Sequence, residues 1–194
     1  MMEKIFTSVA VFAVALMAAT AGLGLWIGDL HGQTDQAILR WGTVHRLSAI
    51  LAALLVVLVN SMSVTYFIGT ARWCREVVET YHLSDKFITK SKGIKRRSFP
   101  FALFGMFCVI AIVALQGAAD PAAGRTGSEA WVNLHLFGRI GLTGVIAVCL
   151  QLQRAKIADQ QSLIEEVLVE VRAMREARGL DVEPNCTTVD SAES

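Results

Sequence analysis

The sequence is poor in charge. Asp, Glu, Lys and Arg make up only 18% of its 194 residues, while 54% of the residues are hydrophobic. Soluble domains carry roughly 25% charged residues, so the composition argues against an ordinary soluble domain, a disordered chain or a collagen-like fibre. The formal net charge is +1, from 18 basic and 17 acidic residues. Taken whole, this near-neutral chain is not expected to bind nucleic acid.

Cysteine motifs and common enzyme signatures are also missing. None of the four cysteines, Cys74, Cys108, Cys149 and Cys186, has a partner at C-x-x-C spacing. The sequence therefore gives no support for a zinc ribbon, an iron–sulfur run or covalent attachment of a c-type haem. The patterns G-x-x-x-x-G-K-[ST], H-E-x-x-H and G-x-S-x-G do not occur either. Whether the chain is an enzyme stays open, and we expect that it is not one by itself.

Four stretches are almost free of charge, and a helix needs about 20 residues to cross a bilayer. They cover about 5–28, 44–71, 98–119 and 130–153. The first run continues past Ala19-Thr20-Ala21, a signal-peptide-like cleavage pattern, so we interpret it as a retained helix. The sequence thus predicts an all-α integral membrane protein, with a four-helix transmembrane bundle over residues 1–153.

The basic residues are distributed unevenly along the chain. Fourteen of the 18 lie before the first span, between the second and third spans, or after the fourth. Cytoplasmic loops of membrane proteins are enriched in Lys and Arg. We therefore predict a multi-pass protein of the inner membrane with both termini in the cytoplasm. The loops 29–43 and 120–129 then face the outside.

The second and fourth spans begin with the same pattern, W-x-x-[VL]-H. It covers Trp41 to His45 and, 90 residues later, Trp131 to His135. Each copy follows an outer loop, which predicts two helical hairpins related as a repeat. The alternative is convergence, because Trp is favoured at membrane interfaces. If both tryptophans mark the outer interface, the two histidines lie at similar depth, one helical turn inside it.

Two histidines at equal depth on alternate helices can face each other across a bundle. Small residues share their helix faces: Ser48 and Ala49 near His45, and Gly138 near His135. This pattern predicts a site for haem b, with His45 and His135 as axial ligands of the iron. Arg46 and Arg139 lie close by, and we assign them to the haem propionates, because guanidinium groups pair well with carboxylates.

This hypothesis makes the chain an electron-transfer module or a subunit of a larger redox complex, with a redox partner outside. Several alternatives remain. Small residues also mark ordinary helix packing. The histidines can bond loop carbonyls, or bind a bacteriochlorophyll or a single metal ion. Arg139 can reach lipid headgroups. The chain can instead be an accessory or scaffold subunit, or a transport protein in which Arg139 and a polar patch at Asn60 line the path.

Beyond the last span, residues 154–179 have a heptad pattern. Ile157, Ile164 and Val171 are seven apart, as are Gln160, Val167 and Met174. The pattern predicts a cytoplasmic amphipathic or coiled-coil helix that Gly179 ends. This seam packs either on the segment around Trp73 or on other copies of the chain, as a homo-oligomer. We expect residues 180–194 to be disordered or partner-bound, and His31 and His82 to be solvated in loops.

Overall fold

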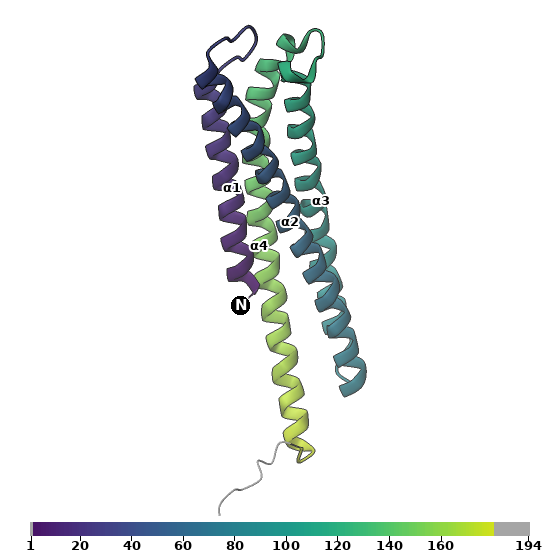
Figure 1. Cartoon of the computed structure of the whole chain (residues 1–194). Helices are drawn as coiled ribbons and strands as arrows, with labels where there is room; N and C mark the ends of the chain where they lie inside the picture. The colour runs from purple at the N-terminus through teal and green to yellow at the C-terminus, as the bar shows by residue number, and fades with distance from the viewer. Residues whose placement is uncertain (1, 181–194) are drawn as a thin grey trace, which may run out of the picture.

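The computed structural model describes residues 2–180 of the chain, and these residues form helices and short connections (Figure 1). Four α-helices and two short 3-10 helices follow one another: α1 (Met2–Ile27), α2 (Gln36–Tyr81), α3 (Lys86–Ala119), η1 (Pro121–Ala123), η2 (Ser128–Trp131) and α4 (Val132–Ala177). The prediction of an all-α fold is confirmed. The predicted tail, residues 180–194, lies outside the described residues except for Leu180.

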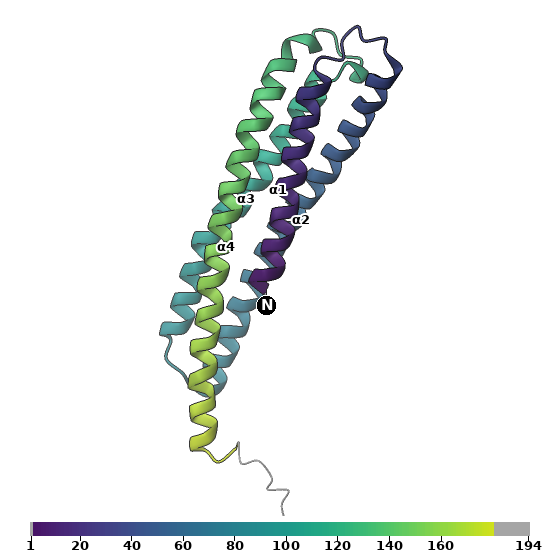
Figure 2. The ribbon, with the colours of Figure 1, turned by 90° about the vertical axis from the view of Figure 1, so that its left-hand side faces the viewer.

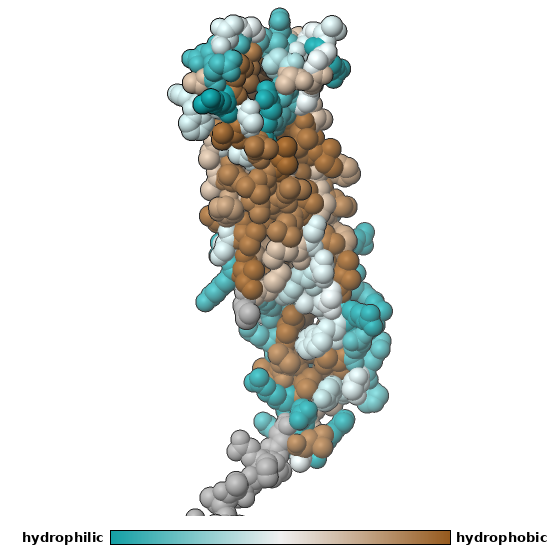
Figure 3. Space-filling view, viewed as in Figure 1, coloured by the Kyte–Doolittle hydropathy of each residue, from teal (hydrophilic) through white to brown (hydrophobic). Residues whose placement is uncertain are grey.

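Each of the four long helices is long and apolar enough to cross a membrane. Large apolar side chains such as Phe12, Leu47, Phe107 and Val148 are exposed on them. On the face drawn in Figure 3, such residues form a broad apolar band between a hydrophilic cap and a more mixed lower part. Exposed apolar surface of this extent is typical of helices that face lipid rather than water.

The helices are arranged in a ring in the order of the chain. α1 and α3 each pack against α2 and α4, and α2 and α4 also touch each other between them. The α1–α2 and α3–α4 connections lie at the same end of the molecule (Figures 1 and 2). α1 is the shortest of the four, so α2, α3 and α4 continue beyond its N-terminus as a three-helix extension. Phe6, Val56, Phe67 and Ile146 are among the fully buried side chains of the core.

The heptad seam of α4 is buried within a single chain. Of the predicted seam, Ile164 and Met174 are only half-buried, and Leu163 takes the place of Ile164 in the core. Ile157, Gln160, Leu163, Val167 and Val171 are buried. The apolar members of this set belong to one core cluster with Cys74, Val78, Phe87 and Ile94, and Trp73 packs against that cluster. Of the two arrangements that the sequence allows, the structure shows packing on the Trp73 segment. α4 ends at Ala177, two residues before Gly179, the glycine expected to end it, which has a φ of +67°. The N–H of Leu180 donates to the carbonyl of Arg175.

Two polar layers, one heptad apart along α4, lie in the apolar core. In the first, Gln160 Nε2 donates to Ser91 Oγ at 3.1 Å. In the second, Gln153 Nε2 donates to Asn60 Oδ1 of α2 at 2.9 Å. Gly105 makes room for Asn60, because a Cβ atom there would lie 3.1 Å from Asn60 Oδ1. Buried polar residues at core positions favour one register of packed helices, because any slip leaves them unpaired.

Replacing Gln160 with alanine is therefore expected to destabilise the three-helix extension. The change leaves the buried Ser91 hydroxyl without its partner and opens a cavity. We expect the free energy of unfolding to fall by about 1–3 kcal/mol, measured by thermal or denaturant unfolding in detergent. Gln151→Ala is the matched control, because Gln151 is exposed on the same helix. Equal losses in both variants would contradict the role assigned to the buried layer.

Candidate functional site

The structure brings together the two histidines of the repeated motif. His45 lies near the start of α2, whose N-cap Asp35 accepts a hydrogen bond from the N–H of Ala37. His135 lies in the first turn of α4. Their ring centroids are 6.5 Å apart and the ring planes are perpendicular. The two rings thus meet across the bundle although 90 residues separate them in sequence.

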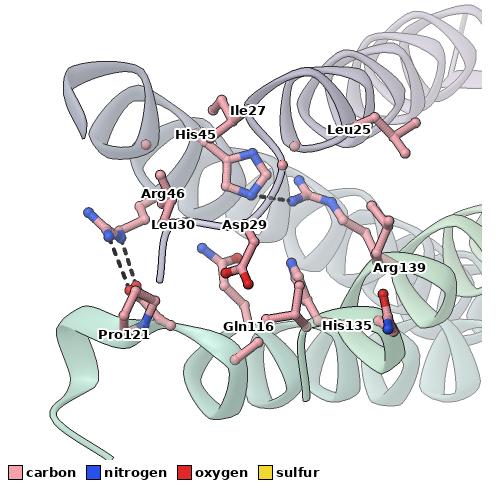
Figure 4. Close-up of a pocket in the computed structure, with 18 of the residues that line it drawn as sticks. Leu25, Ile27, Asp29, Leu30, His45, Arg46, Gln116, Pro121, His135 and Arg139 are labelled. Atoms are coloured by element: carbon pink, nitrogen blue, oxygen red, sulfur yellow. Dashed lines mark hydrogen bonds and ion pairs between the residues drawn. The ribbon is translucent and has the colours of Figure 1, made fainter. Parts of the chain in front are cut away.

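A cavity of about 370 Å³ adjoins both rings at the end of the bundle where the two helix connections lie (Figure 4). Small residues line it on the α1 side, including Ala21, Gly24 and Gly28. The end of α3 and the residue after it contribute Gln116, Ala119 and Asp120, and α4 contributes Asn133, Leu136 and Arg139. All four long helices therefore take part in one pocket.

Arg139 reaches from α4 to His45. Its Nη1 atom lies 2.9 Å from Nε2 of His45, and Figure 4 shows the guanidinium directed at that ring. A guanidinium can only donate, so Nε2 of His45 accepts and the ring is neutral, with its proton on Nδ1. Arg139 is only 3% exposed. Among the ion pairs of the described residues, none neutralises it. Arg139 is therefore a buried positive charge without an ion-pair partner, although Asp29, Asp120 and Glu129 also line the cavity. Such a charge is costly in an apolar setting.

Arg46 has a different environment. Its Nε and Nη2 atoms donate to the two carboxylate oxygens of Asp120, at 2.7 and 3.0 Å. Asp120 also accepts from the N–H of Ala122 and so caps the short helix η1. Arg46 lines the cavity, as the sequence predicts for a propionate partner, but it already has a carboxylate of the protein. Arg46 thus joins α2 to the end of α3.

The small residues next to the ring of His45 lie on α1 rather than on the helices that carry the histidines. A Cβ atom on Gly24 would lie 2.7 Å from Cε1 of His45. The cavity lining does not include Ser48, Ala49 or Gly138. Ser48 donates to the carbonyl of His45, Ala49 is buried, and a Cβ atom on Gly138 would contact Leu115 of α3. No sequence pattern links Gly24 to His45, so reasoning from the motif alone misses it.

The expectation that His31 is solvated is wrong. The side chain of His31 is 14% exposed. It links the α1–α2 connection to the α3–α4 connection. Nδ1 lies 2.6 Å from Oδ1 of Asp29, and Nε2 lies 2.8 Å from Oγ of Ser128. The backbone N–H of His31 also donates to Asp29 and lowers the pKa of that carboxyl. Because Asp29 lines the cavity, this link lies beside the site. His82, by contrast, is exposed at the C-cap of α2.

Comparison with known proteins finds no matching family model, no similar curated protein and no similar solved structure. Within residues 2–180, no group of three or more His, Cys, Asp or Glu side chains is arranged to hold a metal ion. The site is thus defined by two histidines, one buried arginine and the cavity beside them. Its function has to be argued from this geometry.

Proposed function

We propose that the chain is a membrane protein that binds haem b between His45 and His135 and serves as an electron-transfer module, alone or as a subunit of a larger redox complex. The observation that carries the proposal is the pair of imidazole rings on α2 and α4, 6.5 Å apart beside a cavity. Paired imidazoles on facing helices of a bundle are a common way to hold such a cofactor.

The distance between the rings is compatible with one metal ion between them. Imidazole nitrogens bind metals at about 2 Å, and a ring centre lies about 1 Å behind its nitrogen, so two ligands place their centroids about 6 Å apart. Nδ1 of each histidine is buried without a hydrogen-bond partner. Because Arg139 can only donate, the proton of His45 lies on Nδ1, and Nε2 carries the lone pair that an iron would need. Binding requires Arg139 to leave Nε2 of His45.

The surroundings of the rings suit a flat group. Because α2 and α4 carry the ligands, the edges of a macrocycle between them would point toward α1 and α3. At this level α1 presents Ala21 and Gly24, and α3 presents Ala119. Arg139, displaced from His45, would pair with a propionate and thereby gain the anion that it lacks. Haem supplies one-electron redox chemistry, and these residues bind and orient it and compensate its charge.

Insertion into the inner membrane places this site near the outer face. We assign the α1–α2 and α3–α4 connections to the outside, and both termini and the three-helix extension to the cytoplasm, because the basic residues lie on the latter side. The electron donor or acceptor then approaches from the outside. With the seam of α4 buried inside the chain, assembly with further copies or with a larger complex requires another surface.

The transport alternative has less support. The two polar positions that the sequence offers as a path, Arg139 and Asn60, have separate partners: His45 and Gln153. Val56 and Ile146, which lie between them along α2 and α4, are fully buried. An apolar, closely packed layer of this kind separates the outer cavity from the inner polar layers.

The absorption spectrum of the purified protein tests the proposal. We expect a Soret band, and sharp α and β bands after reduction, either as isolated or after addition of haemin to the protein in detergent. Titration should end at one haem per chain. A protein that gives only the spectrum of free haemin under all these conditions would overturn the proposal.

A further inference from the structure

A ladder of ion pairs joins α3 to α4 in the three-helix extension, and it stops short of the apolar spans. Lys86 pairs with Glu170 at 4.0 Å, and Lys90 pairs with Glu166 at 2.7 Å. Each pair is four residues from the next on both helices. After the Gly93 level, the same antiparallel register places Arg97 opposite Asp159. That pair is not formed, because Asp159 accepts from Lys156 at 2.7 Å.

A groove takes the place of the missing pair. It runs along the contact of α3 and α4, and its lining includes Thr89, Lys90, Gly93, Arg97 and Ser162. A Cβ atom on Gly93 would meet no atom within 4 Å, so the floor of the groove is open at its centre. The groove, whose lining also includes Lys86 and Asp159, therefore offers the guanidinium of Arg97 and two hydroxyl side chains. The ammonium group of Lys90 is bound by Glu166.

The positive charge around this groove is largely uncompensated. Among the described residues, Lys92, Lys95, Arg96 and Arg97 form no ion pair, in contrast to Lys86 and Lys90 at the start of α3. The uncharged run of α3 begins at Ser98, directly after Arg97. Four free cations thus lie at the boundary of an apolar span. An anion outside the chain at this level would compensate their charge.

We propose that this groove binds the phosphate of an anionic phospholipid of the inner leaflet, with Arg97 as the main contact. The guanidinium fork matches phosphate oxygens, and the Thr89 and Ser162 hydroxyls can donate to the same group. Lys92, Lys95 and Arg96 attract the anionic surface from the other sides of the helix. This inference rests on the proposed membrane insertion and does not depend on the haem site.

Native mass spectrometry of the detergent-purified full chain tests it, with phosphatidylglycerol or phosphatidylcholine added in equal amounts. We expect phosphatidylglycerol to be retained preferentially, and Arg97→Gln to lower its affinity by about tenfold. Asp159→Asn should raise the affinity, because it removes the nearest carboxylate that competes for Arg97. Arg75→Gln is the matched control, since Arg75 is an exposed arginine of α2 that does not line the groove.

Three outcomes would overturn the proposal. Retention of the two lipids to the same extent would show that the groove does not select anionic headgroups. Equal losses in the Arg97 and Arg75 variants would show general charge attraction without a defined site. Displacement of phosphatidylglycerol by millimolar inorganic phosphate would show a site for the free ion. Release of the chain from membranes by alkaline carbonate would instead contradict membrane insertion, so the two failures are distinguishable.

Discussion

Replacing either His45 or His135 with alanine is expected to change the spectrum of the haem-loaded protein from that of six-coordinate, low-spin iron to that of five-coordinate, high-spin iron. Each variant removes one of the two rings that lie 6.5 Å apart. Loss of a group that only orients a metal ligand costs about 10- to 100-fold in affinity. Loss of the ligand itself should weaken haem binding by more than about 100-fold, and the double variant should bind no haem specifically.

His31→Ala is the matched control for these variants. His31 is a partly buried histidine at the same end of the molecule. It bonds Asp29 and Ser128, and it does not itself line the cavity. We expect its absorption spectrum to equal that of the unchanged protein, measured in parallel. A low-spin spectrum that survives in the double variant would contradict the assignment of His45 and His135. A loss that is as large in His31→Ala would also contradict it.

The long helices were predictable because a bilayer demands long uncharged runs. The runs at 5–28 and 98–119 correspond to α1 and to the C-terminal part of α3. The sequence did not show how far α2 and α3 continue beyond the spans. Residues 72–97 look like a basic loop, but most of them belong to α2 or α3 and pack on the seam of α4. Each helix buries only a short face in this region, so the apolar periodicity of its own sequence is weak. The packing becomes evident only when the three helices are compared.

Part of the site was predictable from the motif alone. Equal spacing from Trp41 and Trp131 placed His45 and His135 at one level, and the structure brings their rings together. The same logic placed Arg139 nearby, where it contacts His45. The Arg46–Asp120 pair and the His31 link depend on how the outer connections fold back, and neither has a signature in sequence spacing. The contribution of α1 was not predictable either, because glycine is frequent in transmembrane helices for several reasons.

That contribution leads to the second large expected effect. Gly24→Ala should disrupt the site while both histidines remain. A Cβ atom at this position would lie 2.7 Å from Cε1 of His45, a distance at which either the ring or α1 must move. Rotation of the ring would break the contact of its Nε2 with Arg139 and change its position relative to the ring of His135. We expect the affinity for haem to fall by about tenfold or more, measured by haemin titration.

Gly22→Ala separates this local contact from general effects on α1. Both changes put alanine into the same helix, where it favours helix formation relative to glycine. A Cβ atom on Gly22 meets no atom within 4 Å, so this variant should bind haem as the unchanged protein does. If the two variants behave alike, the close packing of Gly24 on His45 does not control the site. A selective defect in Gly24→Ala would show that α1 holds His45 in position, because no ligand has been removed and only the fit of the ring has changed.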